Sequence, residues 1–145
     1  MQVETQTCLV ILLACLLVCG CSEPIQNLGS VRFEDGQPVQ AGSIEFRSLA
    51  DGTRYASRIN EEGGFELLDA DGEAACSPGE YEVVVVQMVL TEDLAANQHS
   101  HGRTVPRRFA DYYTSGLRAS VSGSASDLIK VELPLLPSEQ AATAH

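Results

Sequence analysis

The chain has 145 residues, of which 44% are hydrophobic and 20% are charged, a composition typical of one globular domain with short extensions. Its formal net charge of −11 argues against a nucleic-acid partner, because an acidic surface repels phosphate groups. Tryptophan is absent and aromatic residues make up only 6%, so the core must be built mainly from Val, Leu and Ile.

The N-terminal segment has the pattern of a secretory signal. Twelve apolar residues, Cys8 to Cys19, are followed by Gly20-Cys21 and then by polar residues. A membrane-spanning helix needs about 20 apolar residues, whereas the apolar part of a signal peptide has roughly 7–15. The stretch Val18-Cys19-Gly20-Cys21 resembles a bacterial lipobox, in which the cysteine receives acyl chains such as palmitate. The sequence therefore predicts a lipoprotein signal peptide over residues 1–20 and a membrane anchor at Cys21.

Alternatives to this interpretation stay open. The first seven residues contain Glu4 and no Lys or Arg, unlike most signal peptides, so Met1 need not be the true start. Leu12–Cys15 form a second lipobox-like stretch, although cleavage there would leave the apolar residues 16–18 at the mature N-terminus. A secretory signal of another kind and a buried structural segment are the remaining alternatives.

Cysteine usage follows from this prediction. Four of the five cysteines lie in the N-terminal segment, so acylation of Cys21 would leave Cys76 as the one free thiol of the mature chain. An intramolecular disulfide is then impossible. Cys76 is expected to be a small buried side chain, with an intermolecular bridge or a reactive thiol as the alternatives.

After a predicted tether at residues 21–28, apolar and polar residues alternate in short segments separated by turn-forming residues. This period of two predicts strands with one buried face. The predicted strands are residues 30–34, 43–47, 54–59, 65–68, 81–89, 117–121 and 127–133. The side chains expected to point inward are Val31, Phe33, Ile44, Phe46, Tyr55, Ser57, Ile59, Phe65, Leu67, Tyr81, Val83, Val85, Leu117, Ala119, Val121, Ile129, Val131 and Leu133.

Between these strands the chain lacks a long helical pattern. Val84 and Val86 make the second face of their strand apolar, which predicts a central or partly covered strand. Residues 91–102 are polar and irregular, with at most one helical turn near Leu94–Ala96. The sequence therefore predicts an all-β fold, a single seven- or eight-stranded Greek-key β-sandwich over residues 29–133, followed by a disordered tail at 134–145.

Four stretches in order resemble the carboxypeptidase regulatory-like domain, also called transthyretin-like or prealbumin-like. They are GSVRFEDGQPVQAGSIEFR at 29–47, INEEGGFEL at 59–67, SPGEYEVVV at 77–85, and VPRRFADYYTSGLRASV at 105–121 with DLIKVEL at 127–133. The last of these looks like the closing part of small bacterial lipoproteins built on this domain. The resemblance implies a surface-displayed β-sandwich that serves as an accessory or binding module. Glu61–Gly64 depart from the family's Asp-Gly turn, which affects only local turn geometry.

One cluster combines basic and aromatic residues in this acidic chain. The stretch PRRFADYY contains Arg107, Arg108, Phe109, Tyr112 and Tyr113. Aromatic faces stack on sugars and arginines bind carboxylates in a bidentate manner, so these residues form a candidate recognition surface. The alternative is packing, with Phe109 and one tyrosine covering an end of the sandwich.

No metal site or other cofactor is predicted. Asp69, Asp71 and Glu73 alternate like a fragment of a calcium loop, but the strand that follows replaces the closing Glu that such a loop requires. His99 and His101 could share a metal in an extended loop, although two further ligands are missing nearby. An ordinary turn and a solvated loop are the alternatives for these two stretches.

Catalytic motifs are also missing from the sequence, and the protein is predicted not to be an enzyme. A transthyretin-related hydrolase would need more histidines than the chain's three and a Ser-rich C-terminal signature, whereas this chain ends in ATAH. Carboxylates on outward strand faces are expected to be solvated.

The sequence predicts a membrane-anchored lipoprotein of the cell envelope, on its periplasmic or outer face. Its domain is predicted to be a non-catalytic binding or structural module, and its partner a protein or a glycan. A carbohydrate- or calcium-associated adhesion module is the alternative. Ser22, in place of an Asp directly after Cys21, favours outward sorting.

Overall fold

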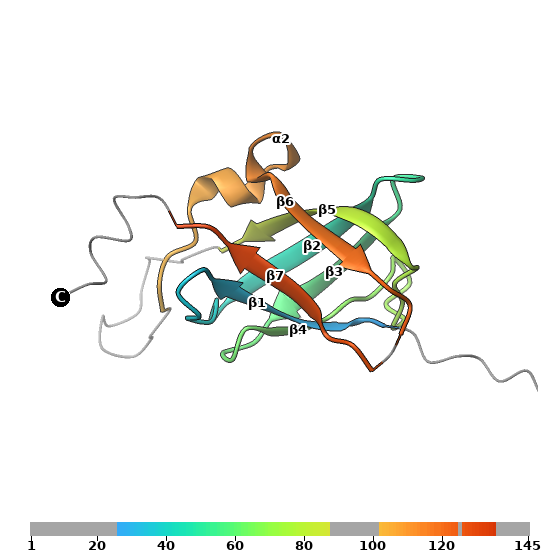
Figure 1. The fold of residues 1–145 in the computed structure, drawn as a ribbon, viewed down its shortest axis with the longest axis horizontal. Helices are drawn as coiled ribbons and strands as arrows, with labels where there is room; N and C mark the ends of the chain where they lie inside the picture. The colour runs from blue at the N-terminus through green and yellow to red at the C-terminus, as the bar shows by residue number, and fades with distance from the viewer. Residues whose placement is uncertain (1–25, 88–101, 125, 136–145) are drawn as a thin grey trace, which may run out of the picture.

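The computed structural model describes residues 26–87, 102–124 and 126–135 (Figure 1). Within these ranges the chain forms strands in two sheets and two helical elements of four residues each, which confirms the predicted all-β class. The predictions that lie outside the described residues concern the signal segment, Cys21, residues 22–25, Leu94–Ala96, His99, His101 and residues 136–145.

Seven strands are found in the described residues. The three-stranded sheet has the order β4-β1-β7 and the four-stranded sheet the order β3-β2-β5-β6. All pairs are antiparallel except β1 with β7, which run parallel. The elements are β1 (Leu28–Phe33), β2 (Gly42–Ser48), β3 (Arg54–Ile59), β4 (Gly64–Glu66), β5 (Gly79–Val86), the 3₁₀ turn η1 (Arg107–Ala110), α2 (Tyr112–Ser115), β6 (Leu117–Val121) and β7 (Ile129–Leu133).

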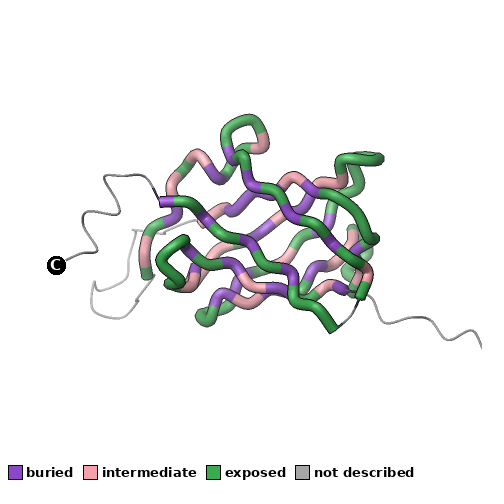
Figure 2. Tube along the Cα trace, in the orientation of Figure 1, coloured by how far each residue is buried: buried purple, intermediate pink, exposed green. Residues whose placement is uncertain are grey.

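The two sheets share one hydrophobic core. Buried and exposed residues alternate along the strands, as a period of two requires (Figure 2). The ring of Phe46 on the four-stranded sheet lies 5.7 Å from that of Phe65 on the three-stranded sheet, measured between centroids. Every predicted inward side chain is buried except Ser57, which is half-exposed. Its hydroxyl donates to the carbonyl of Arg58 and accepts from the amide of Glu66, so it serves the strand edge instead of the core.

Strand β5 lies between β2 and β6, which confirms that it is central. Its outward residue Val84 is only 6% exposed. The residue opposite Val84 on β2 is Glu45, and Tyr112 of α2 reaches that glutamate. Helix α2 therefore covers the outward face of β2 and β5, where the second row of apolar residues lies.

The folded region begins earlier than the predicted strands. Gln26 is 4% exposed although it falls in the predicted tether. Its amide nitrogen donates to the carbonyl of Asp127 over 2.7 Å, and its amide oxygen accepts from the backbone and side chain of Ser122. These partners are about a hundred residues away along the chain, so no local pattern indicates them.

The folded region also ends later than predicted. Leu135 lies in the predicted tail, but its side chain is buried and its amide donates to Glu34 over 3.1 Å. The folded domain thus extends beyond the predicted range of 29–133, from Gln26 at least to Leu135.

Cys76 is a free cysteine and is 2% exposed. Burial raises the pKa of its thiol, which keeps the side chain neutral. The prediction that Cys76 is a small buried side chain is confirmed.

Candidate functional site

The segment from Pro106 to Gly116 forms two short turns that the sequence analysis did not predict. Asp111 ends η1 and begins α2, and its carboxylate accepts from the amide of Tyr113 over 2.7 Å. Gly116, at φ 64°, ends α2 in the left-handed conformation that glycine favours. An Asp followed five residues later by a Gly is a capping signal that could have indicated this helix.

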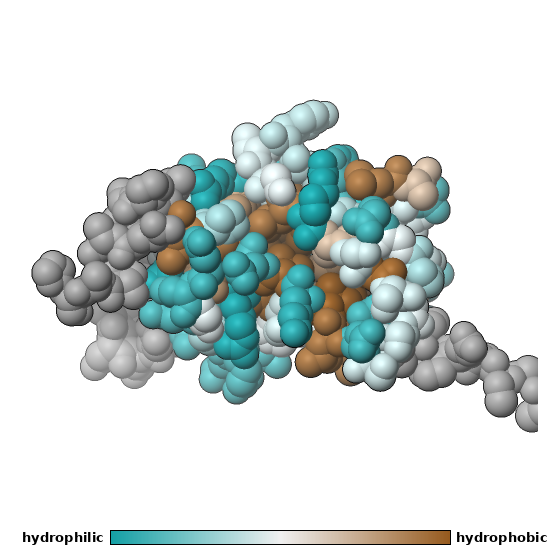
Figure 3. Space-filling model, in the orientation of Figure 1, coloured by the Kyte–Doolittle hydropathy of each residue, from teal (hydrophilic) through white to brown (hydrophobic). Residues whose placement is uncertain are grey.

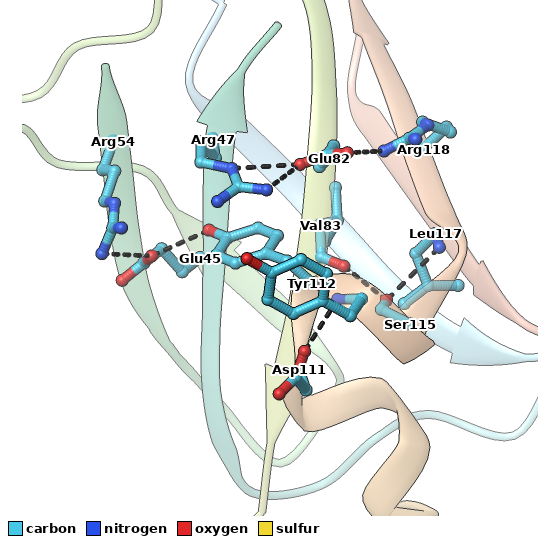
Figure 4. Close-up of polar contacts among 11 residues, drawn as sticks. Glu45, Arg47, Arg54, Glu82, Val83, Asp111, Tyr112, Ser115, Leu117 and Arg118 are labelled. Carbon is cyan, nitrogen blue, oxygen red and sulfur yellow. Dashed lines mark hydrogen bonds and ion pairs between the residues drawn. The ribbon is translucent and has the colours of Figure 1, made fainter. Parts of the chain in front are cut away.

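Helix α2 is attached to the sheet by its last residue. The hydroxyl of Ser115 donates to the carbonyl of Val83 over 2.5 Å and accepts from the amide of Leu117. These bonds hold α2 against β5 and the start of β6, so that Tyr112 lies over the four-stranded sheet (Figure 4).

The structure separates the five residues of the predicted recognition surface. Phe109 is 1% exposed and belongs to the core, and Arg108 lies over its ring and donates to the carbonyl of Pro134 over 2.6 Å. Phe109 thus serves packing, as the alternative interpretation predicted, and Arg108, which that alternative did not include, packs on it. Tyr113, in contrast, is 96% exposed, and Arg107 is exposed as well.

Tyr112 belongs to a group of side chains that the sequence analysis did not bring together. The other members occupy neighbouring outward positions on all four strands of the sheet, and Tyr112 lies over them from α2 (Figure 4). We call the whole group the sheet-face cluster: Glu45, Arg47, Arg54, Glu82, Tyr112 and Arg118.

Glu82 is the centre of the cluster. One of its carboxylate oxygens accepts from Nε of Arg47 over 3.0 Å, and the other pairs with Nη1 of Arg118 over 2.8 Å. The hydrogen bonds from Arg47, together with those from Arg118, lower the pKa of Glu82. The expectation that outward carboxylates are simply solvated is therefore wrong for Glu82, whose side chain is only 18% exposed.

Tyr112 joins α2 to this network. Its hydroxyl donates to Oε1 of Glu45 over 2.8 Å, and the guanidinium of Arg47 lies 4.0 Å from its ring centroid. Burial raises the pKa of Tyr112, and the neighbouring Glu45 carboxylate raises it further. Arg54 lies 3.5 Å from the same carboxylate with 61% of its side chain exposed. Tyr112 is thus a neutral aromatic platform between charged side chains.

The candidate metal ligands at 69–73 form a turn. Oδ1 of Asp69 accepts from the amides of Asp71 and Glu73, over 2.9 and 3.0 Å. Asp69 therefore stabilises its own loop. Within residues 26–87, 102–124 and 126–135, no three His, Cys, Asp or Glu side chains are grouped so that they could hold a metal ion.

Replacing Glu82 with glutamine is expected to make the free energy of unfolding depend less on pH between pH 7 and pH 3. Because the pKa of Glu82 is lower in the folded chain, its ion pairs stabilise the fold above the ordinary glutamate pKa of about 4.3. That contribution is lost as the pH falls through the lowered folded-state pKa. Urea unfolding at pH 7 and pH 3 should therefore show an advantage of the wild type over Glu82→Gln that shrinks at pH 3.

The matched control for this experiment is Glu80→Gln, which changes an exposed carboxylate on the same strand. Glu80→Gln should behave like the wild type at both pH values. An equal response of the two variants would contradict the role assigned to Glu82.

The sheet-face cluster is suited to binding anions. It has three arginines against two glutamates, so it carries an excess of positive charge in a strongly acidic chain. Arg54 and Arg118 have more than half of their side chains exposed, so a carboxylate or another oxyanion can approach their guanidinium groups.

In the described part of the chain, neither helical element has the length and apolar content that crossing a bilayer requires. Comparison of the chain with protein-family models, with curated proteins and with solved structures finds no match in any of the three.

Proposed function

We propose that the protein is a cell-envelope lipoprotein, anchored through an acylated Cys21, whose single domain is a non-catalytic binding or structural module. The observation that carries this proposal is a twelve-residue apolar run that leads to a cysteine, with the folded domain starting close behind it. Only four residues, 22–25, separate Cys21 from Gln26, whose side chain is already buried in the domain. A run of this length suits export, and several acyl chains on one cysteine suit stable anchoring.

The proposed architecture is a transthyretin-like Greek-key β-sandwich of the carboxypeptidase regulatory-like family. Two observations support it: the sheets share a core, and the chain passes between them repeatedly. After β3 the chain enters the other sheet as β4 and returns as β5 beside β2, a connection of the Greek-key kind. The four family-like stretches fall on β1–β2, on β4, on β5, and on the region from η1 to β7.

The position of the anchor favours an outward-facing recognition surface. Gln26 bonds to Asp127 before the start of β7, whereas Arg108 bonds to Pro134 after the end of β7. These contacts mark opposite ends of the domain, and η1 and α2 lie at the end away from the start of the described chain (Figure 1). An anchor at Cys21 would therefore present η1 and α2 away from the membrane, with Arg107 and Tyr113 exposed.

One observation favours the alternative of a glycan-binding adhesion module. Tyr113 is 96% exposed, and an exposed aromatic ring in the same short segment as the exposed Arg107 suits stacking on an acidic sugar. Retention on an array of acidic glycans that Tyr113→Ala abolishes would support this alternative. Retention that is unchanged in Tyr113→Ala, or absent in the wild type, would contradict it. The calcium form of the alternative finds less support, because Asp69 is engaged by its own loop.

The anchor is tested by mass spectrometry of the N-terminal peptide of protein isolated from bacterial membranes. The wild type should begin at Cys21 and carry the mass of its acyl chains. Cys21→Ser should keep residues 1–20 and lack acyl chains. Cys15→Ser, which changes the second lipobox-like stretch, is the matched control and should be processed like the wild type.

Two results would contradict the proposal. One is an unprocessed chain in the cytosol with an unmodified thiol at position 21. The other is acylation at Cys15 that disappears in Cys15→Ser and persists in Cys21→Ser.

A further inference from the structure

A shallow groove of about 460 Å³ lies where β4 and the start of β1 meet the edge strand β3. Its walls include the side chains of Leu28 and Leu128, which are 49% and 58% exposed, and the edge of Phe65. Figure 3 shows hydrophobic surface over the beginning of β1 and β4. The outward positions of β1 and β7 otherwise carry polar side chains, whereas Leu28 stands at the first outward position of β1 and Leu128 directly before β7. An exposed apolar surface of this kind suits contact with a partner.

The parallel pairing of β1 with β7 explains why the two leucines meet. Gly29 lies opposite Ile129, so Leu28 and Leu128 each come one residue before this pair on two neighbouring segments of the chain. Adjacent strands are about 4.8 Å apart, and residues in equivalent positions point to the same face. Gly29 shapes the groove as well, because a Cβ atom there would lie 2.2 Å from Cζ of Phe65.

The groove lies at the end of the domain where the chain arrives from Cys21. Leu28 follows Gln26 by two residues, and Gln26 bonds to the carbonyl of Asp127, directly before Leu128. The seven residue steps from Cys21 to Leu28 span at most about 25 Å in an extended chain. A lipid anchor at Cys21 would therefore keep both leucines within reach of the membrane surface.

We propose that Leu28 and Leu128 rest on the bilayer that holds Cys21 and dock this end of the domain against the lipid headgroups. The inference depends on the proposed function, since the anchor supplies the proximity. Because the anchor makes the contact intramolecular, a small apolar patch is sufficient, although it would not bind a membrane alone. Arg58 and Glu66 line the same groove with opposite charges, which suits zwitterionic headgroups that also carry both signs.

Docking of this kind would have a consequence for the proposed binding role. It would hold η1 and α2, with Tyr113 and Arg107, on the side of the domain that faces away from the membrane. The domain would then present one surface outward instead of tumbling on its tether.

The absence of tryptophan from the chain makes a direct test possible. Leu128→Trp introduces a single tryptophan in the groove, and Tyr113→Trp introduces one at the opposite, fully exposed site. Both full-length variants are isolated from membranes, checked for acylation by mass spectrometry, and reconstituted into phosphatidylcholine vesicles with and without brominated acyl chains. The fluorescence emission of Leu128→Trp should be blue-shifted, and brominated lipid should quench most of its intensity. Tyr113→Trp should show neither the blue shift nor the quenching.

Each other outcome decides against the inference. Acylated Leu128→Trp that is not quenched would overturn the docking and leave the proposed anchor intact. A blue shift without quenching would mean that the groove is covered by protein, such as a second copy of the chain. Protein that lacks acyl chains would overturn the anchor and the docking together.

Discussion

Replacing Phe46 with alanine is expected to lower the free energy of unfolding by about 3–5 kcal/mol. The side chain is fully buried, and its ring centroid lies 5.7 Å from that of Phe65 and 5.8 Å from that of Tyr81. Phe65 belongs to the three-stranded sheet and Tyr81 to the four-stranded one, so truncation leaves a cavity between the two layers. Denaturant unfolding of the purified protein measures this change in the free energy of unfolding.

Two further variants keep this experiment interpretable. A domain of this size has a total stability of about 5–15 kcal/mol, so Phe46→Ala could leave too little folded protein to measure. Phe46→Leu keeps part of the volume and should give a smaller, measurable loss. Leu49→Ala, at a position 52% exposed, should change stability by no more than about 0.5 kcal/mol. A similar small effect of Phe46→Leu and Leu49→Ala would contradict a core shared by both sheets.

The second large effect is expected at Gly42, at the start of β2. Its φ of +126° is one that residues with a side chain rarely adopt, and a Cβ atom there would lie 2.4 Å from the carbonyl oxygen of Val86. Gly42→Ala should therefore combine backbone strain of about 1–2 kcal/mol with an overpacking cost of about 1–3 kcal/mol. Thermal or denaturant unfolding gives the total.

The matched control is Gly36→Ala. Gly36 also has a positive φ, +85°, but a Cβ atom there would have no neighbour within 4 Å. Gly36→Ala should cost only the backbone strain, about 1–2 kcal/mol. A loss at Gly36 that equals or exceeds the loss at Gly42 would contradict the close approach of β2 to the end of β5.

Strand faces could be predicted from the sequence because the signal is local. In β2, Ile44 and Phe46 alternate with Glu45 and Arg47, and a strand can bury only one of these two sets. The same reasoning failed for Ser57, because its hydroxyl is used by the backbone of neighbouring residues and its side chain stays half-exposed. Inward position and burial are therefore separate properties for a small polar residue.

The candidate site was predicted only in part. The sequence indicated the aromatic and basic residues near position 110, and the structure places Tyr113 and Arg107 on the surface and Phe109 in the core. Local composition does not distinguish these outcomes, because the direction of each side chain depends on the short turns η1 and α2. A helix of four residues has too few positions to show a period, and only its caps could have indicated it.

By itself the amino-acid sequence determined the all-β class and the core side chains that lie on strands, because alternation along a strand sets which face is buried wherever the strand lies. Core residues outside the strands, such as Val39 and Val105, follow no such pattern and were not predicted. The tertiary structure alone decided which strands are neighbours. It brought Arg47, Glu82 and Arg118 into one network. It also placed Leu28 beside Leu128, because the first strand of the described chain pairs in parallel with the last. Such pairings depend on backbone hydrogen bonds and packing between segments far apart in the chain, which are absent from any local pattern.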